Sequence, residues 1–184
     1  MADTGLLLID IQNDYFPGGK MELHEMKKAA ANAEKALKKF RALKKPVFHV
    51  KHIAASPALG FFIEDTEGSK INTTVKPEGS EKVIVKKEIN SFKGTNLKAE
   101  LDAANIKNLV VVGAMSHMCV DGTVRAASDL GYKVQLLQDA CATCNLEHGG
   151  KKVPAEDVQA TMMAALGFAY AEVSNTDDAL AKLK

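Results

Sequence analysis

The sequence predicts an α/β protein built on an open, doubly wound parallel sheet of about six strands, with helices on both faces. Short apolar segments alternate along the chain with segments of helical periodicity, which is the order of repeated β-α units. Several apolar segments are continuous rather than alternating, as expected for strands that are covered on both faces. A length of 184 residues with 46% hydrophobic residues fits one core, so we expect a single domain over residues 1–184.

Six segments rich in β-branched or apolar residues are the expected strands: residues 5–10, 46–52, 82–86, 108–113, 133–139 and 168–173. Apolar residues repeat at steps of three and four in the expected helices, which are residues 23–40, 95–104, 119–130 and 155–166. Pro46 forbids continuation of the first helix. Gly131 and Gly167 directly follow two of the helical patterns and are expected to end them.

Two segments interrupt this alternation. Residues 53–81 contain several glycines and prolines and form a longer connection than compact domains normally have. Loops of this length usually carry binding residues, so we interpret the segment as a wall or cover of the functional site. Residues 141–154 form a second, shorter connection that we interpret in the same way.

Composition excludes several classes of partner. The chain has 24 Lys and Arg residues against 23 Asp and Glu residues, so no excess of positive charge is present to bind nucleic acid or an anionic membrane. The N-terminus shows no signal peptide and the chain no membrane span, and three cysteines make no disulfide framework, so we expect a cytoplasmic protein. Neither a phosphate-binding loop nor a dinucleotide-binding glycine motif is present, and no nucleotide cofactor is indicated.

Reactive side chains stand where three expected strands end. Asp10 ends the first strand, Lys86 ends the third, and Cys119 follows the fourth at the start of a helix. Ligands of open parallel sheets bind beyond the carboxyl ends of the strands, so this acid, amine and thiol should converge there. A thiol needs a base, a cation or a helix N-terminus for activation. Taken singly, Asp10 could cap a turn, Lys86 could be solvated and Cys119 could fill the core.

Three motifs in order carry a family resemblance. The stretches "LLLIDIQNDYFPGGK", "VIVKKEINSFKGTNL" and "LVVVGAMSHMCVDGTVRAASDLGYKVQLLQDAC" resemble the isochorismatase-like superfamily of cysteine hydrolases, which includes nicotinamidases, N-carbamoylsarcosine amidohydrolases and isochorismatases. The resemblance implies an Asp10-Lys86-Cys119 triad that cleaves a C–N bond of a small amide through a thioester. It also implies a small-molecule substrate, no cofactor, and a homo-oligomer, either a dimer or a tetramer.

The same resemblance assigns further positions. The family lysine follows a "V-x-V" strand and precedes a phenylalanine, which selects Lys86 and leaves Lys87 as the alternative. A cis peptide is implied between Ala114 and Met115, with the amides of Met115 and Cys119 directed at an oxyanion. The residues expected to contact substrate are Phe16, His52, Ser116 and His117.

Metal binding is not expected. The nicotinamidase metal site needs an acidic residue that the stretch "HVKHIAAS" lacks, and we expect His49 to be packed in the core. Cys141, Cys144 and His148 have a spacing that could recruit zinc, but a structural zinc site takes four ligands. Two alternatives to the amidase stay open at this point: a vinyl ether hydrolase that does not need the thiol, and a binding protein on the same fold.

Overall fold

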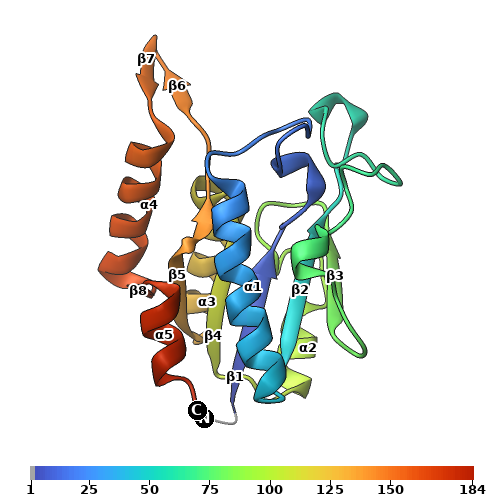
Figure 1. Ribbon diagram of the computed structural model, residues 1–184, viewed down its shortest axis with the longest axis vertical. Helices are drawn as coiled ribbons and strands as arrows, with labels where there is room; N and C mark the ends of the chain where they lie inside the picture. Colours follow the sequence, from blue (N-terminus) through green and yellow to red (C-terminus); the bar gives the residue numbers. More distant parts are fainter. Residues whose placement is uncertain (1–2) are drawn as a thin grey trace.

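The computed structural model describes residues 3–184 and contains a sheet in the order β3-β2-β1-β4-β5-β8 (Figure 1). All neighbouring strands of this sheet are parallel. Its strands are β1 Thr4–Ile9, β2 Val47–His52, β3 Lys82–Lys86, β4 Asn108–Ala114, β5 Lys133–Ala142 and β8 Glu172–Ser174. The predicted α/β class and parallel sheet are confirmed.

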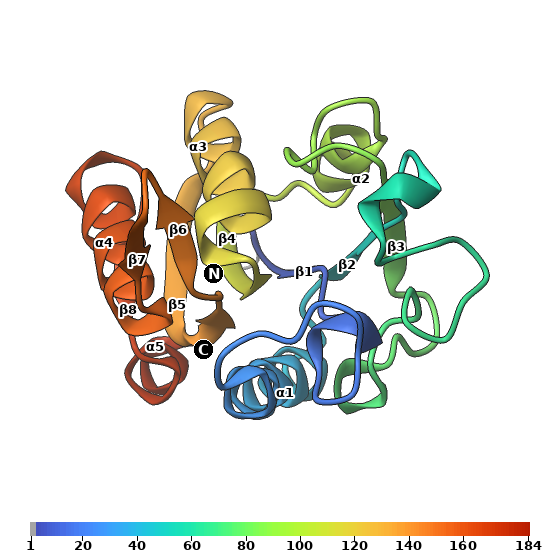
Figure 2. The same ribbon diagram turned by 90° about the horizontal axis from the view of Figure 1, so that it is seen from above.

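Helices cover both faces of the sheet, as Figure 2 shows. One face carries α1 Met26–Ala42 and α5 Thr176–Lys182, and the other carries α2 Leu97–Ala103, α3 Asp121–Asp129 and α4 Ala155–Ala169. The shorter turns are η1 Asn13–Tyr15, η2 Pro57–Leu59, η3 Thr73–Val75 and the π-helical η4 Ser116–Val120. Within residues 3–184, no helix has both the length and the apolar character of a bilayer-spanning segment.

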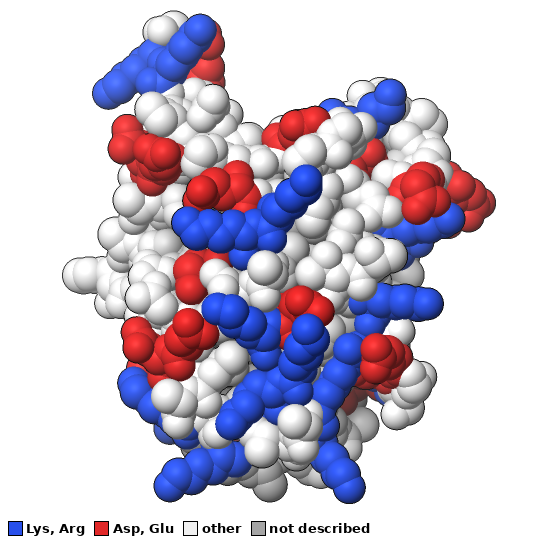
Figure 3. Space-filling view, in the orientation of Figure 1, with Lys and Arg blue, Asp and Glu red and all other residues white. Residues whose placement is uncertain are grey.

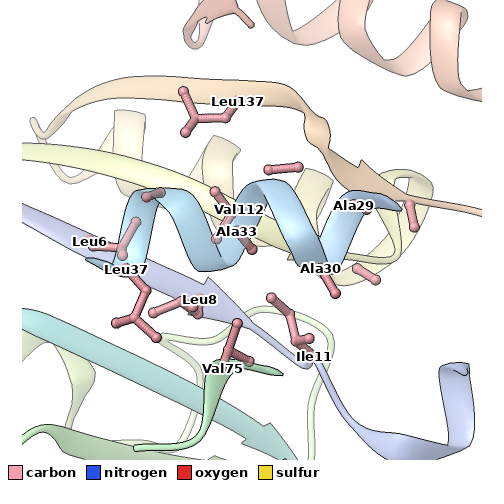
Figure 4. Close-up of a cluster of buried hydrophobic side chains, with 14 of the residues drawn as sticks. Leu6, Leu8, Ile11, Ala29, Ala30, Ala33, Leu37, Val75, Val112 and Leu137 are labelled. Carbon is pink, nitrogen blue, oxygen red and sulfur yellow. The ribbon is translucent and has the colours of Figure 1, made fainter. Parts of the chain in front are cut away.

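Small residues let α1 lie close to the sheet. Ala29, Ala30 and Ala33 are almost fully buried and face Leu8 of β1 and Val112 of β4 (Figure 4). They recur at helical spacing, so one stripe of the helix is apolar. The opposite stripe carries Lys and Arg side chains, which Figure 3 shows over this helix. The predicted amphipathic helix is therefore present, although it begins at Met26 rather than at residue 23.

The C-terminal part of the chain corrects two sequence predictions. Gly167 does not end α4, which continues to Ala169, and the Tyr170 N–H donates to the Leu166 carbonyl at 2.9 Å. Phe168 is therefore helical and 91% exposed rather than part of a strand, and β8 is confined to Glu172–Ser174. The sequence pattern failed here because "GFAYAEV" has β propensity, whereas the backbone hydrogen bonds continue the helix.

The expected loop 141–154 is also more regular than predicted. Strand β5 runs on to Ala142, and an antiparallel hairpin follows, with strands β6 Leu146–His148 and β7 Lys151–Val153. The long segment 53–81, in contrast, contains only the short turns η2 and η3. Both segments rise above the carboxyl ends of the strands in Figure 1. They are thus placed to border a site at that end of the sheet.

The direction of strand addition reverses between β1 and β4, which are adjacent in the sheet. The chain adds β2 and β3 on one side of β1, and then returns to add β4, β5 and β8 on the other. Gly113 pairs with Ile9 at this point, and a Cβ on Gly113 would lie 2.0 Å from the Ile9 carbonyl oxygen. Only glycine permits this approach. Ligand sites in open parallel sheets lie at such reversals.

Candidate active site

Asp10 follows the last residue of β1 and turns away from the strand. Its φ angle is +51°, a left-handed conformation that non-glycine residues rarely adopt. The Asp10 N–H donates to the Val50 carbonyl at 3.1 Å, and the Asp10 carbonyl accepts the Gln12 N–H at 2.9 Å. The residue has no exposed surface. The backbone therefore fixes a buried carboxyl group at the carboxyl end of the central strand.

Lys86 is the last residue of β3 and pairs with His52 of β2. One face of this edge strand is buried and the other is open to solvent. Ile84 and Lys86 lie on the buried face, whereas Val85 and Lys87 are exposed. This alternation directs the Lys86 ammonium group into the protein.

Cys119 lies in the π-helical turn η4, which connects β4 to α3. The Ala114–Met115 peptide that precedes the turn is cis. The Met115 carbonyl accepts hydrogen bonds from the N–H groups of Met118 and Val120, at 3.0 and 3.1 Å. The helical conformation thus begins at Ser116, before the predicted start at Cys119. Cys119 is 3% exposed.

The structure brings these three side chains together around the Lys86 ammonium nitrogen. Lys86 Nζ lies 2.8 Å from Asp10 Oδ2 and 3.2 Å from Cys119 Sγ. It also lies 2.8 Å from His52 Nδ1 and 2.9 Å from the Glu88 carbonyl oxygen. Both carboxylate oxygens of Asp10 are buried and neither accepts a hydrogen bond from residues 3–184, although Oδ2 is paired with the Lys86 charge. The cluster combines a cation, a carboxylate without a hydrogen-bond donor, and a thiol.

Burial and charge shape the protonation of the cluster. Burial raises the pKa of Cys119, and the Asp10 carboxylate raises it further, while Lys86 opposes both effects. Burial lowers the pKa of Lys86, but Asp10 and Cys119 outweigh burial and raise this pKa above its usual value. Burial and the Lys86 charge lower the pKa of His52. These shifts favour a charged ammonium, a neutral imidazole and a protonated thiol in the cluster.

Gln12 joins the end of β1 to the loop over the site. Its side-chain amide donates to the carbonyls of His52 at 2.8 Å and Ser69 at 2.9 Å, and its Oε1 accepts the His52 N–H at 2.7 Å. Asp14 accepts the Phe62 N–H at 2.7 Å. Sequence reasoning did not single out these two residues, although both belong to the motif "DIQNDYF" that drew attention to Asp10.

An aromatic cluster lies beside the triad. The Phe62 ring centroid is 4.6 Å from that of Tyr15, 5.0 Å from that of Phe61 and 5.9 Å from that of His52. Phe61 and Phe62 come from the segment 53–81. Burial and the nearby Asp10 and Cys119 raise the pKa of Tyr15 well above its usual range. The long loop thus adds apolar rings next to the cluster.

The residues expected to contact substrate have different surroundings. His52 contacts Lys86, and Phe16 is half-buried and packs against the core on the α1 side. Ser116 is fully buried, with its hydroxyl 2.6 Å from Gln159 Oε1 and 3.2 Å from the Ala142 carbonyl. His117 is half-buried, and its Nδ1 lies 2.6 Å from Thr143 Oγ1. The Ser116 hydroxyl is thus engaged within the fold.

Two groups of side chains bear on metal binding. Asp10, His52 and Cys119 offer ligand atoms that lie within 4.8 Å of one another. The Lys86 ammonium lies between them, so a metal ion would meet a positive charge there. Cys141, Cys144 and His148 do not form a three-ligand group within the described part of the chain. The zinc-like spacing of these three residues in the sequence is therefore not matched by a zinc site among the described residues.

Comparisons with known proteins identify the fold. The Isochorismatase domain model matches residues 4–178. The chain belongs to the isochorismatase family. The isochorismatase family protein YddQ of Bacillus subtilis is 51% identical over 174 residues, which cover 95% of this chain and 97% of that protein. The crystal structure of an isochorismatase-family hydrolase from Oleispira antarctica superimposes with a TM-score of 0.95 at 48% identity, covering 98% of this chain and 97% of that chain.

A third isochorismatase-family relative has a named activity. Streptothricin hydrolase of Streptomyces noursei is 31% identical over 173 residues, which cover 94% of this chain and 59% of that protein. With the family shown, the chain is an isochorismatase-family hydrolase, as the sequence motifs predicted. This result disfavours the alternative that the chain is a non-catalytic binding protein.

Proposed function

We propose that this hydrolase cleaves a C–N bond of a small amide through a thioester on Cys119. The observation that supports this most is the contact of one ammonium nitrogen, Lys86 Nζ, with both Asp10 Oδ2 at 2.8 Å and Cys119 Sγ at 3.2 Å. A nucleophile, a proton acceptor and a cation within hydrogen-bond reach are what acyl transfer to sulfur requires. Streptothricin hydrolase is a relative whose name is consistent with this reaction class.

The first step moves a proton and forms a bond. The Cys119 thiol transfers its proton to Asp10, whose Oδ1 has no other hydrogen-bond partner among residues 3–184, and the sulfur attacks the carbonyl carbon. Lys86 then donates to the sulfur and balances the charge that shifts from the carboxylate to the reacting atoms. Because burial raises the pKa of Cys119, proton transfer and attack are expected to be coupled.

The remaining steps return the enzyme to its resting state. The tetrahedral oxyanion accepts hydrogen bonds from the amides of Met115 and Cys119. The C–N bond breaks, and the amine or ammonia leaves with the proton from Asp10. Water then gives a proton to Asp10 and attacks the thioester, which releases the carboxylic acid and restores the thiol.

Ammonia release from a panel of small primary amides tests this function. The wild-type protein is expected to turn over at least one member, and Cys119→Ala to release none while keeping its fold. Cys144→Ser is the matched control, because Cys144 is a half-buried thiol outside the cluster and its loss should leave turnover unchanged. Release by Cys119→Ala at the wild-type rate would reject the thioester and favour a reaction that does not need the thiol, such as vinyl ether hydrolysis.

Substrate contact is proposed for Phe16 and His117, together with the aromatic cluster. Phe16 follows Tyr15 of that cluster, and His117 lies in the same turn as Cys119. Phe16→Ala and His117→Ala are each expected to raise KM more than they lower kcat, because neither residue contacts the triad. A fall in kcat with KM unchanged would argue that they act on the chemical step instead.

The protein is also proposed to form a homo-oligomer through α4. This helix carries only two charged residues, Glu156 and Asp157, and its outward stripe of Asp157, Thr161, Ala164 and Phe168 is exposed. Figure 3 shows acidic side chains over the upper end of α4 and a mostly uncharged surface below them. Interfaces are depleted of charge and enriched in aromatic residues.

We propose that a second copy packs on this stripe, so that Phe168, which is 91% exposed in the single chain, is covered in the oligomer. Phe168→Glu should convert the oligomer to monomer in light scattering, whereas Leu130→Glu, at the exposed leucine that follows α3, should not. A monomeric wild-type protein would reject the proposal.

We also propose that the protein is located in the cytoplasm. Cys119, Cys141 and Cys144 are all free thiols in the structure, which suits a reducing compartment. Fractionation of cells that express the full chain would test it, and recovery in the secreted fraction would contradict it.

A further inference from the structure

Asp14 is an almost fully buried carboxylate that is held by backbone groups alone. Its Oδ2 accepts the Phe62 N–H at 2.7 Å, and its Oδ1 accepts the Lys20 N–H at 3.2 Å. A buried carboxylate is costly unless such donors surround it. An asparagine side chain has one acceptor oxygen and could take only one of these two hydrogen bonds. Both oxygens of the carboxylate are therefore used.

The backbone around Asp14 leaves room for this carboxylate. The Asp14 N–H donates to the Gly68 carbonyl at 2.9 Å, and the Asp14 carbonyl accepts the Met21 N–H at 2.9 Å. A Cβ on Gly68 would overlap the Asp14 carboxylate, so only glycine fits there. The segment 53–81 is thus fixed to η1 at this point.

Phe62 has a conformation that needs such support. Its φ angle is +55°, in the left-handed region that a bulky residue rarely adopts. Its carbonyl accepts the Ala54 N–H at 2.9 Å, and its N–H is the one that Asp14 accepts. If this N–H were released, the backbone would favour an extended or right-handed conformation, and the ring would leave its position.

The Phe62 ring borders the triad through His52. Its centroid lies 5.9 Å from that of the His52 ring, and ligand atoms of His52 and Cys119 lie within 4.8 Å of each other. The residues that precede Phe62 give it little help. Within the described part of the chain, residues 55–60 form hydrogen bonds only among themselves. The fixed part of the loop therefore begins at Phe62, where Asp14 holds it.

We propose that Asp14 is a positioning residue, which holds the Phe62 ring beside Cys119 and thereby sets the apolar wall against which substrate binds. The inference rests on the proposed thiol chemistry. Asp14 forms no hydrogen bond with the triad and acts through the Phe62 backbone. Loss of its carboxylate should change which molecules reach Cys119 and leave the chemistry of the thiol as it is.

The experiment compares two alkylating reagents that differ by one aromatic ring. With iodoacetamide or iodoacetanilide, the Cys119 sulfur bonds to the same carbon, iodide leaves, and the thiol proton passes to solvent. Peptide mass spectrometry reads Cys119 separately from Cys141 and Cys144. The ratio of the two labelling rates, divided by the same ratio for free cysteine, does not depend on the thiolate fraction, because both reagents react with the same thiolate.

The variants separate the carboxylate from the ring. Asp14→Asn keeps the shape of the side chain but leaves one N–H group without an acceptor, and Phe62→Ala removes the ring. The wild-type ratio should favour iodoacetanilide, and each variant should lower it about threefold, as expected for loss of one aromatic contact. The double variant should fall no further than Phe62→Ala. Glu67→Gln is the matched control, because Glu67 is exposed and accepts hydrogen bonds from Asn13 on the same loop, and it should keep the wild-type ratio.

Several outcomes would overturn the proposal. An Asp14→Asn ratio equal to that of the wild type would do so, and so would a double variant that falls below Phe62→Ala, because Asp14 would then act by another route. An unchanged ratio in Phe62→Ala would reject the wall itself. A wild-type Cys119 that neither reagent labels would also count against it, because the ring would then border no space open to a ligand.

The wild-type protein offers a second measurement that needs no variant to fold. The Phe62 amide should exchange with deuterium far more slowly than the amides of residues 55–60, and equal rates would overturn the proposal. Thermal unfolding checks that each variant is folded at the assay temperature. Alkylation needs no turnover, so a negative amide screen would leave this result standing, and a positive screen would not rescue an unchanged ratio.

Discussion

Two histidines of β2, three residues apart in the sequence, contact side chains of opposite charge. His49 lies at 2.9 Å from the Glu81 carboxylate, measured from Nε2 to Oε2. His52 lies at 2.8 Å from the Lys86 ammonium, measured from Nδ1 to Nζ. Their odd spacing places the two side chains on opposite faces of the sheet. Burial lowers the pKa of both, so both are neutral at pH 7.

The two regions differ in how donors and acceptors are matched. Glu81 receives two hydrogen bonds from Arg41, at 2.7 and 2.8 Å, and one from the Glu78 N–H at 2.9 Å, so its charge is compensated. Around Lys86 the ammonium donates to His52, to the Glu88 carbonyl and to Cys119, while neither carboxylate oxygen of Asp10 accepts a hydrogen bond from residues 3–184. Buried polar groups are normally satisfied, and exceptions often mark sites of chemistry. His49 Nδ1 is also buried without a partner, so what distinguishes the two ends of β2 is the carboxylate: that of Glu81 is hydrogen-bonded and that of Asp10 is not.

Removal of the central cation should give the largest effect. Lys86→Met keeps the length of the side chain but leaves Asp10 buried without its ion pair. We expect turnover to fall about a thousandfold or more, because the charge that supports the sulfur is lost. Unfolding in urea should show a loss of about 3–5 kcal/mol, the usual result of breaking one side of a buried pair.

The neighbouring lysine supplies the control. Lys87 is exposed, so Lys87→Met should change turnover and stability by less than measurement error. If Lys87→Met abolished turnover and Lys86→Met did not, the assignment of the cation on β3 would be wrong.

Sequence reasoning located the convergence of groups at the reactive end but not its details. Strand ends can be read from apolar runs, and parallel strands bring their carboxyl ends together, so Asp10, Lys86 and Cys119 could be associated without coordinates. The choice of Lys86 over Lys87 came from the family resemblance, and the burial of Lys86 agrees with it. Local patterns were enough to locate the strand ends because strand geometry is regular.

The set of hydrogen-bond acceptors around Lys86 could not be obtained in that way. It depends on the Glu88 carbonyl and on the direction of the His52 ring, which Gln12 fixes through backbone contacts. Side-chain direction at a strand end depends on tertiary neighbours rather than on sequence period. For the same reason the sequence predicted a strand at Phe168, where tertiary context favours helix.

A smaller effect is expected from the structural end of β2. Burial would raise the pKa of Glu81, but Arg41, the Glu78 N–H and His49 outweigh it and lower the pKa from 4.5 to about 2. Its folded-state pKa lies below the unfolded value, so the carboxylate contributes stability that is present above about pH 4.5 and is lost as the pH falls toward 2. Glu81→Gln should cost about 2 kcal/mol at pH 7 and flatten the loss of stability between pH 5 and pH 2.

Turnover per folded molecule gives the contrasting measurement for Glu81→Gln. The Glu81 cluster lies at the start of β3, whereas the triad lies at the strand's end, so kcat should stay at the wild-type value. Unchanged acid stability in Glu81→Gln would mean that other carboxylates control unfolding in that pH range.

The smallest effect should come from His49 itself. His49 Nδ1 is buried without a hydrogen-bond partner, so His49→Leu removes one unsatisfied atom together with the bond to Glu81. These changes partly cancel, and we expect a loss of no more than about 1 kcal/mol in urea unfolding. The pH midpoint for alkylation of Cys119 by iodoacetamide should stay at the wild-type value, because His49 contacts none of the partners of Lys86. A shift in that midpoint would show that a substitution at the structural end of β2 alters the thiol, and the distinction between the two histidines would fail.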